Sequence, residues 1–201
     1  MNNNLKFFTS EELHRFWQVV DNDTSRHRVR NMALMHVLYD CALRVSECNS
    51  LKFKDYNQQK HTMYCERLKG GNNNTILLYD DYTVELLQDH IRIRKPSSAN
   101  DYLFISQKGN PLSRKTIDAL MKSYCEEAEI EDKSKWHIHT LRHTRAIEIA
   151  EAGADLKDLQ FFLGHKHVDN TLIYFTYTTA QQKALYRKVR KSKYGKSKRE
   201  N

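Results

Sequence analysis

Apolar residues recur at intervals of three and four along most of the chain, which is the spacing of helices with one buried face. Leu13, Phe16 and Val20 lie on one such stripe. Thr9 followed by Glu12 has the capping-box pattern, so we expect this helix to begin there. Further helices are predicted over residues 29–41, 46–51, 82–94, 113–129, 138–152, 155–163 and 170–190.

A few short segments favour strands instead. Thr62–Cys65 and Thr75–Tyr79 are β-prone, and Gly70–Asn74 between them is typical of a turn, so residues 60–79 predict a hairpin. Tyr102–Ile105 predicts one more short strand. The expected fold class is therefore α+β, mainly α-helical, with a small antiparallel sheet and no linker that divides it.

The charge of the chain is concentrated at one end. The net charge is +8, and residues 181–201 hold nine Lys and Arg residues against one acid, which leaves residues 1–180 neutral. A basic end on a neutral body favours contact with nucleic-acid phosphates. The alternative is a solvated tail that only aids solubility. Four cysteines without C-x-x-C spacing, and no apolar run of membrane-spanning length, indicate a cytoplasmic protein without membrane contact.

Side chains suited to phosphoryl transfer are spread over the sequence. Guanidinium groups hold a phosphate that becomes more negative in the transition state. Imidazoles hydrogen-bond its oxygens and move protons, and a tyrosine hydroxyl can form a covalent intermediate. The candidates are Arg44, His139, Arg142, His143, His165 and Tyr174.

Metal and nucleotide sites are weaker interpretations. His139 and His143 lie on one helix face and could bind zinc, but Arg142 between them would repel a dication. The helix also lacks the glutamate of H-E-x-x-H, so we expect no metal. Gly70 and Gly71 lack the Walker pattern and fit a hairpin turn better.

Simpler roles are open for single residues. Arg44 alone could pair with Glu47 at the surface, although an arginine after a buried helix needs an anion of some kind. Tyr174 in an apolar run is typical of a core residue, and Tyr177, one helical turn later, is a rival nucleophile.

Together and in this order, the motifs resemble the catalytic domain of the tyrosine recombinase (phage-integrase-like) family. The family pattern is G-[LM]-R-x-[ST]-E, a hairpin lysine, His-x-x-Arg with a following His, Leu-Gly-His, and a tyrosine nine residues later. The matching residues are Arg44, Glu47, Lys69, His139, Arg142, His143, Leu163, Gly164, His165 and Tyr174. The last spacing favours Tyr174 over Tyr177. Ala42 replaces the usual glycine, and Cys41 a common threonine.

The extent of the resemblance suggests a subgroup. It covers residues 9–180, and because its first helix begins near residue 9, we expect no separate DNA-clamping domain before it. This layout and the stretch Phe104–Arg114 are similar to short fimbrial phase-variation DNA invertases. We expect residues 1–180 to form the catalytic domain and residues 181–201 a basic C-terminal helix or tail.

The resemblance implies that DNA is cleaved and rejoined through a 3′-phosphotyrosine, without cofactors. Tyr174 is then the nucleophile, Arg44 and Arg142 clamp the phosphate, and Lys69 protonates the leaving 5′-oxygen. His139 would accept the tyrosine proton. The remaining roles are a phosphate contact for His165, support from Glu47 and His143, and DNA contacts from Arg187, Lys188, Arg190 and Lys191.

The resemblance also implies partners. These are double-stranded DNA with paired recombination sites, three further copies in a homotetramer on synapsed DNA, and accessory DNA-bending proteins at the bacterial nucleoid. The alternatives are an integrase or excisionase of a mobile element, a type IB topoisomerase, and a non-catalytic DNA-binding regulator.

Overall fold

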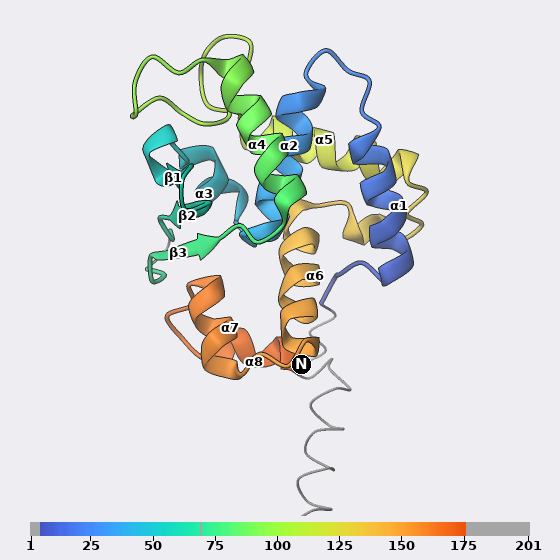
Figure 1. Ribbon diagram of the computed structural model, residues 1–201. Coiled ribbons are helices and arrows are strands. Elements are labelled where there is room, and N and C mark those ends of the chain that lie inside the picture. Colours follow the sequence, from blue (N-terminus) through green and yellow to red (C-terminus); the bar gives the residue numbers. More distant parts are fainter. Residues whose placement is uncertain (1–4, 69, 176–201) are drawn as a thin grey trace, which may run out of the picture.

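The computed structural model describes residues 5–68 and 70–175 (Figure 1). Its α-helices are α1 (Ser10–Asp21), α2 (Arg28–Asp40), α3 (Val45–Ser50), α4 (Asp81–Arg94), α5 (Arg114–Glu127), α6 (Ile138–Glu151), α7 (Leu156–Leu163) and α8 (Asp169–Phe175). The helix predicted over residues 170–190 is confirmed as far as Phe175, and its remainder lies outside the described residues.

Side-chain caps explain where several helices begin. The hydroxyl of Thr9 accepts from the N–H of Glu12, and the Glu12 carboxylate accepts from the N–H of Thr9, which confirms the predicted capping box. Asp80, Ser113 and Asp155 cap α4, α5 and α7 through their own side-chain oxygens. Because these bonds join residues only two or three positions apart, the sequence pattern predicted where these helices begin.

The sheet has three antiparallel strands in the order β1 (Tyr56–Asn57), β2 (Thr62–Cys65) and β3 (Asn74–Leu77). Met63 pairs with Ile76, so both buried side chains face the core, and the predicted hairpin is confirmed. The two-residue strand β1 was not predicted because it is too short to show a period. Among the described residues, the mainly helical α+β fold otherwise matches the expectation.

The strand predicted over Tyr102–Ile105 is wrong. Tyr102 and Ile105 form only isolated bridges, with Lys52 and Pro111 respectively. Proline cannot donate to a ladder, and the chain turns at once, with the Ser106 N–H bonded to the Asn110 carbonyl. The segment is β-like but has no partner long enough for a sheet.

Helix α2 lies at the centre of the main core. It packs against α1, α4 and α6, and Leu34, Met35 and Leu38 are fully buried. All four cysteines are buried and free. Within the part of the chain that is described, no helix is long and apolar enough to cross a membrane.

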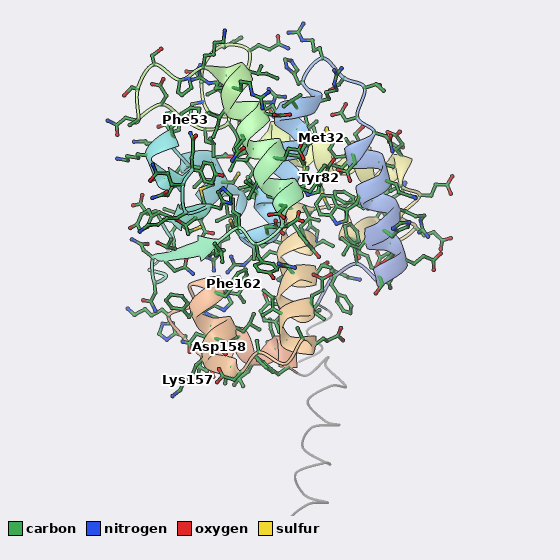
Figure 2. All side chains as sticks on the ribbon, in the orientation of Figure 1. Met32, Phe53, Tyr82, Lys157, Asp158 and Phe162 are labelled. Atoms are coloured by element: carbon green, nitrogen blue, oxygen red, sulfur yellow. The ribbon has the colours of Figure 1, made fainter. Side chains whose placement is uncertain are left out.

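A second, smaller core joins α6, α7 and α8. Ala146, Ala150, Leu159 and Tyr174 belong to it. In Figure 1, α6 runs from the larger part of the molecule to α7 and α8, and the sheet and α7 lie on the same side of α6. Figure 2 shows Phe162 on α7 near β3; its side chain packs against both cores. Two of the candidate site residues, Arg142 and His165, lie where α6 meets the end of α7.

Candidate active site

Arg44 is placed by a sharp turn after α2. The chain leaves the helix at Cys41, and Ala42 adopts a left-handed conformation with φ of 44°. This backbone explains why a glycine is usual at this position, since a side chain there is strained. Arg44 then precedes α3, and its N–H and guanidinium both donate to the carboxylate of Glu47, at 2.8 and 2.6 Å.

Glu47 is a buried carboxylate that holds several cations. It is 1% exposed, and its Oε2 atom lies 3.0 Å from an Arg67 nitrogen and 3.8 Å from an Arg142 nitrogen. Burial raises the pKa of Glu47, but the Arg44 N–H and the charges of Arg67 and Arg142 outweigh it, leaving the pKa below its usual value. Glu47 therefore stays ionised and fixes the arginines around it.

Arg142 lies in the second turn of α6 and points into the junction between the cores. It donates to the carbonyls of Ala42 and Leu163 and to the Nε2 atom of His165, the last at 3.0 Å. Burial, with the charge of Arg44, lowers its pKa to about 10, so the guanidinium remains charged at neutral pH. Arg142 thus connects the turn before Arg44 to the Leu-Gly-His segment.

His165 follows Gly164, which ends α7 in the left-handed conformation. Since an arginine only donates, the Nε2 atom of His165 accepts from Arg142. Its Nδ1 atom then carries the hydrogen and donates to the Thr171 hydroxyl at 2.9 Å. Burial and the charge of Arg142 lower the pKa of His165 to about 3, so the ring is neutral.

Tyr174 is 2% exposed, and its hydroxyl lies 2.9 Å from the Nδ1 atom of His143. Burial raises the pKa of Tyr174, while the charges of Arg142 and Arg44 act in the opposite direction. Burial and the neighbouring His139 lower the pKa of His143 to about 3, so its ring is neutral and able to accept a hydrogen.

This contact bears on the roles expected for His139 and His143. We expected His139 to receive the tyrosine proton and His143 to support it, but His143 makes the contact with Tyr174. His143 lies one helical turn further along α6 than His139, and α8, which carries Tyr174, packs against α6. His139 lies behind it, with its ring centre 6.2 Å from that of His143.

A cavity of about 200 Å³ opens beside these residues. Its walls come from the Arg44 turn, the β2–β3 turn and the segment after α7, including Arg44, Leu68, Gly71, His165, Lys166 and Asn170. Among the described residues that line this cavity, two are permanent cations and none is a carboxylate. We call it the Arg44 cavity; its charge suits an anion such as a phosphate group.

Several predicted site residues lie outside the described residues: Lys69, Arg187, Lys188, Arg190 and Lys191. The rival nucleophile Tyr177 does as well. Over residues 5–68 and 70–175, no group of three or more His, Cys, Asp or Glu side chains is arranged to hold a metal ion.

Sequence reasoning missed Arg67 and Asn74. Both are buried polar residues on the hairpin, and they bond to each other and to the end of α7. The available signal was an arginine in the short stretch between a predicted strand and a glycine-rich turn. That signal is weak, because most arginines at such places are exposed.

Comparison with known proteins identifies the family of this chain. The chain matches the phage integrase family over residues 6–181. The tyrosine recombinase XerC of Listeria welshimeri is 30% identical over 189 residues, covering 91% of this chain and 61% of that protein. XerD of Listeria monocytogenes is 30% identical over 164 residues, covering 79% of this chain and 54% of that protein. The chain therefore spans less than two thirds of the length of these curated relatives.

Solved structures give the same fold. XerA recombinase has a TM-score of 0.76 at 26% identity, over 92% of this chain and 65% of that one. XerH bound to difH substrate, in a pre-cleavage complex, has a TM-score of 0.77 at 24% identity, over 90% of this chain and 54% of that one. The catalytic domain of bacteriophage HP1 integrase has a TM-score of 0.66 at 18% identity, and the match covers 92% of this chain and 95% of that one. The chain belongs to the phage integrase family, and its described residues have the fold of a tyrosine recombinase catalytic domain.

Proposed function

We propose that this protein is a tyrosine-type site-specific DNA recombinase. One observation carries the proposal: residues far apart in sequence come together around one cavity. Arg44 and His165 line the Arg44 cavity, and Arg142 bonds to His165. The centre of the Tyr174 ring lies 6.5 Å from that of His165, and its hydroxyl bonds to His143. Two guanidiniums, neutral imidazoles and a tyrosine hydroxyl are the groups needed to bind the phosphate, accept a proton and attack phosphorus.

In the proposed reaction, the Tyr174 oxygen attacks phosphorus and forms a 3′-phosphotyrosyl bond, while the 5′-oxygen leaves. Arg44 and Arg142 bind the non-bridging oxygens and stabilise the charge that grows on them. Glu47 keeps both guanidiniums in place. A 5′-hydroxyl from a second strand reverses the attack and joins the new ends.

Proton transfer needs one acceptor and one donor. We assign the first to His143, because its ring already contacts the Tyr174 hydroxyl. A bound phosphate anion would raise the low pKa of this imidazole toward the range in which a base is effective. Lys69 is proposed as the acid for the leaving oxygen, His165 as a phosphate contact, and His139 as a supporting residue.

Double-stranded DNA with paired sites is the proposed substrate, bound by four copies of the chain. The support is that XerH was solved with difH substrate, and the integrase of transposon Tn1549 with transposon right-end DNA. Residues 1–180 are proposed to form the catalytic domain, and residues 181–201 a separate basic tail. This tail is proposed to contact DNA through Arg187, Lys188, Arg190 and Lys191. Free, buried cysteines are consistent with a place in the bacterial cytoplasm, at the nucleoid.

Within this class we favour a DNA invertase that controls phase variation, assisted by DNA-bending proteins. Its support is the likeness of Phe104–Arg114 to the fimbrial subgroup. Integration or excision by a mobile element is the alternative, and the orientation of the two sites decides between them.

Capture of covalent protein–DNA adducts from cells tests the proposal. Adducts that require Tyr174 and map to a pair of repeats are expected, and inverted repeats would identify an invertase. Adducts scattered over the genome would indicate a topoisomerase instead. If the Tyr174→Phe variant retained both adducts and recombination, the proposed chemistry would be wrong.

A further inference from the structure

Arg67 is a buried cation at the edge of the site to which the proposed reaction gives no role. Its side chain is 0% exposed, although arginine is rarely buried without a partner. A guanidinium in the interior costs much free energy unless each donor is satisfied. Arg67 satisfies its donors mainly through contacts with three separate parts of the chain, and it also donates to the Cys41 carbonyl at the longer distance of 3.4 Å.

The first contact is with Glu47, whose Oε2 atom accepts from Arg67 at 3.0 Å. The second is across the hairpin, where the Arg67 Nε atom donates to the Asn74 side chain at 3.0 Å. The third is with the end of α7, where the Phe162 carbonyl accepts at 2.8 Å. Asn74 in turn donates to the carbonyls of Phe161 and Phe162. One guanidinium thus joins α3, the hairpin and α7.

Backbone contacts bring the same parts together. The Asn72 N–H donates to the Gly164 carbonyl at 3.0 Å. A Cβ atom on Gly164 would lie 2.5 Å from Cγ of Arg67 and 2.7 Å from the Asn72 carbonyl oxygen. A Cβ on Gly71 would lie 2.7 Å from the Gly164 oxygen. The β2–β3 turn therefore packs directly on the segment that leads to His165.

We propose that Arg67 is a positioning residue that fixes the β2–β3 turn against the end of α7. It thereby sets where the described part of the turn lies relative to Arg44 and His165; in the sequence, Lys69 stands between Leu68 and Gly70 of that turn. This inference rests on the proposed function, in which Lys69 is the acid for the leaving oxygen. A lysine at position 67 would keep the charge beside Glu47 but lacks the planar fork that reaches all three acceptors.

The test compares two leaving groups on DNA carrying the cleavage site recovered from adducts. One substrate has the ordinary 5′-oxygen at the scissile bond and the other has sulfur. A thiol has a pKa of about 8.5, so a thiolate leaves without an acid, whereas an alkoxide does not. Arg67→Lys should cleave the oxygen substrate about 10- to 100-fold more slowly, as expected for a misplaced catalytic group, and sulfur should restore most of the rate.

Three variants make the result interpretable. Lys69→Ala should show the same rescue by sulfur, and Asn74→Ala should resemble Arg67→Lys without altering the charge. Arg92→Lys, at a side chain 77% exposed on α4, should behave as the unsubstituted protein. Failure of sulfur to rescue Lys69→Ala would remove the proposed acid without deciding the role of Arg67.

Hydrogen exchange then decides the role of Arg67 without any DNA. Arg67→Lys should speed exchange of the Asn72 amide, which is bonded to Gly164, while amides in α4 stay unchanged. Unaltered exchange at Asn72 would overturn the inference. So would an Arg67→Lys variant with full activity on the oxygen substrate, or equal losses on both substrates while Lys69→Ala is rescued.

Discussion

At the scale of single residues, the site depends on cations and neutral rings held in a buried setting. Glu47 is the residue that makes this possible, because its ionised carboxylate balances Arg44, Arg67 and Arg142. Removal of Arg44, whose side chain is 25% exposed, leaves Arg67 and Arg142 beside Glu47, so its effect should fall on the chemistry more than on folding.

Arg142→Ala should slow DNA cleavage by about 10²- to 10³-fold, the usual loss when one donor to a charged transition state is removed. Binding of DNA should change far less, since most of its affinity comes from other phosphate contacts. Single-turnover cleavage and a gel-shift titration measure the two effects. An Arg142→Ala protein that cleaves normally would remove this residue from the site; Arg92→Ala is the matched control.

The neutral state of His143 predicts a pH dependence of stability. Its pKa is lowered to about 3 in the folded protein, against 6.5 for an ordinary histidine. The unfolded chain therefore binds the proton more readily, so the contribution of His143 is complete above pH 6.5 and is lost as the pH falls toward 3. His143→Gln should make the urea midpoint of unfolding depend less steeply on pH between pH 6.5 and 4.5. If the midpoint of the variant falls with pH as steeply as that of the unsubstituted protein, the ring of His143 is not buried in its neutral form.

At the scale of elements, local chemistry made most of the fold predictable. The Thr9 capping box, the turn at Gly70–Asn74 and the alternation in β2 and β3 each act within a few residues, so their signals lie in the sequence. The failed strand at Tyr102–Ile105 depended on a distant partner. The contact between His143 and Tyr174 depends on how α8 packs on α6, which no local pattern contains.

Gly164→Ala tests the packing between the hairpin and α7. Both Gly164 and Gly109 have positive φ, which costs a non-glycine residue about 1–2 kcal/mol. A Cβ on Gly109 meets nothing within 4 Å, whereas one on Gly164 collides with Arg67. Gly164→Ala should therefore lower the free energy of unfolding clearly more than Gly109→Ala in urea titrations. Equal losses would mean that the contact with Arg67 is not tight.

At the scale of the whole molecule, the motif order predicted the family, but not the distances. Arg44, Arg142, His165 and Tyr174 come from α2–α3, α6, the end of α7 and α8, and the chain must fold before they meet. The resemblance supplied these residues because their spacing is specific in combination. Arg67 has no counterpart in that pattern, so only its buried contacts revealed it.

Removal of residues 191–201 should weaken DNA binding and flatten its salt dependence. This segment carries Lys191, Lys193, Lys196, Lys198 and Arg199. For every phosphate that the shortened protein no longer binds, the slope of log K against log salt should become shallower by about 0.9. Replacing the five residues by glutamine, at full length, is the matched control and should have the same effect. If the slope of log K against log salt is unchanged in both variants, residues 191–201 do not contact DNA phosphates.

Tyr174 is, in the proposed reaction, the residue whose side-chain oxygen links protein to DNA, and the whole assignment depends on it. The most direct test is mass spectrometry of the nuclease-trimmed, protease-digested adduct, which identifies the residue that carries the 3′-nucleotide. We predict that the nucleotide is attached to Tyr174, and that Tyr174→Phe yields no modified peptide. Attachment to Tyr177, or to a residue outside the Leu163–Tyr174 segment, would contradict the assignment.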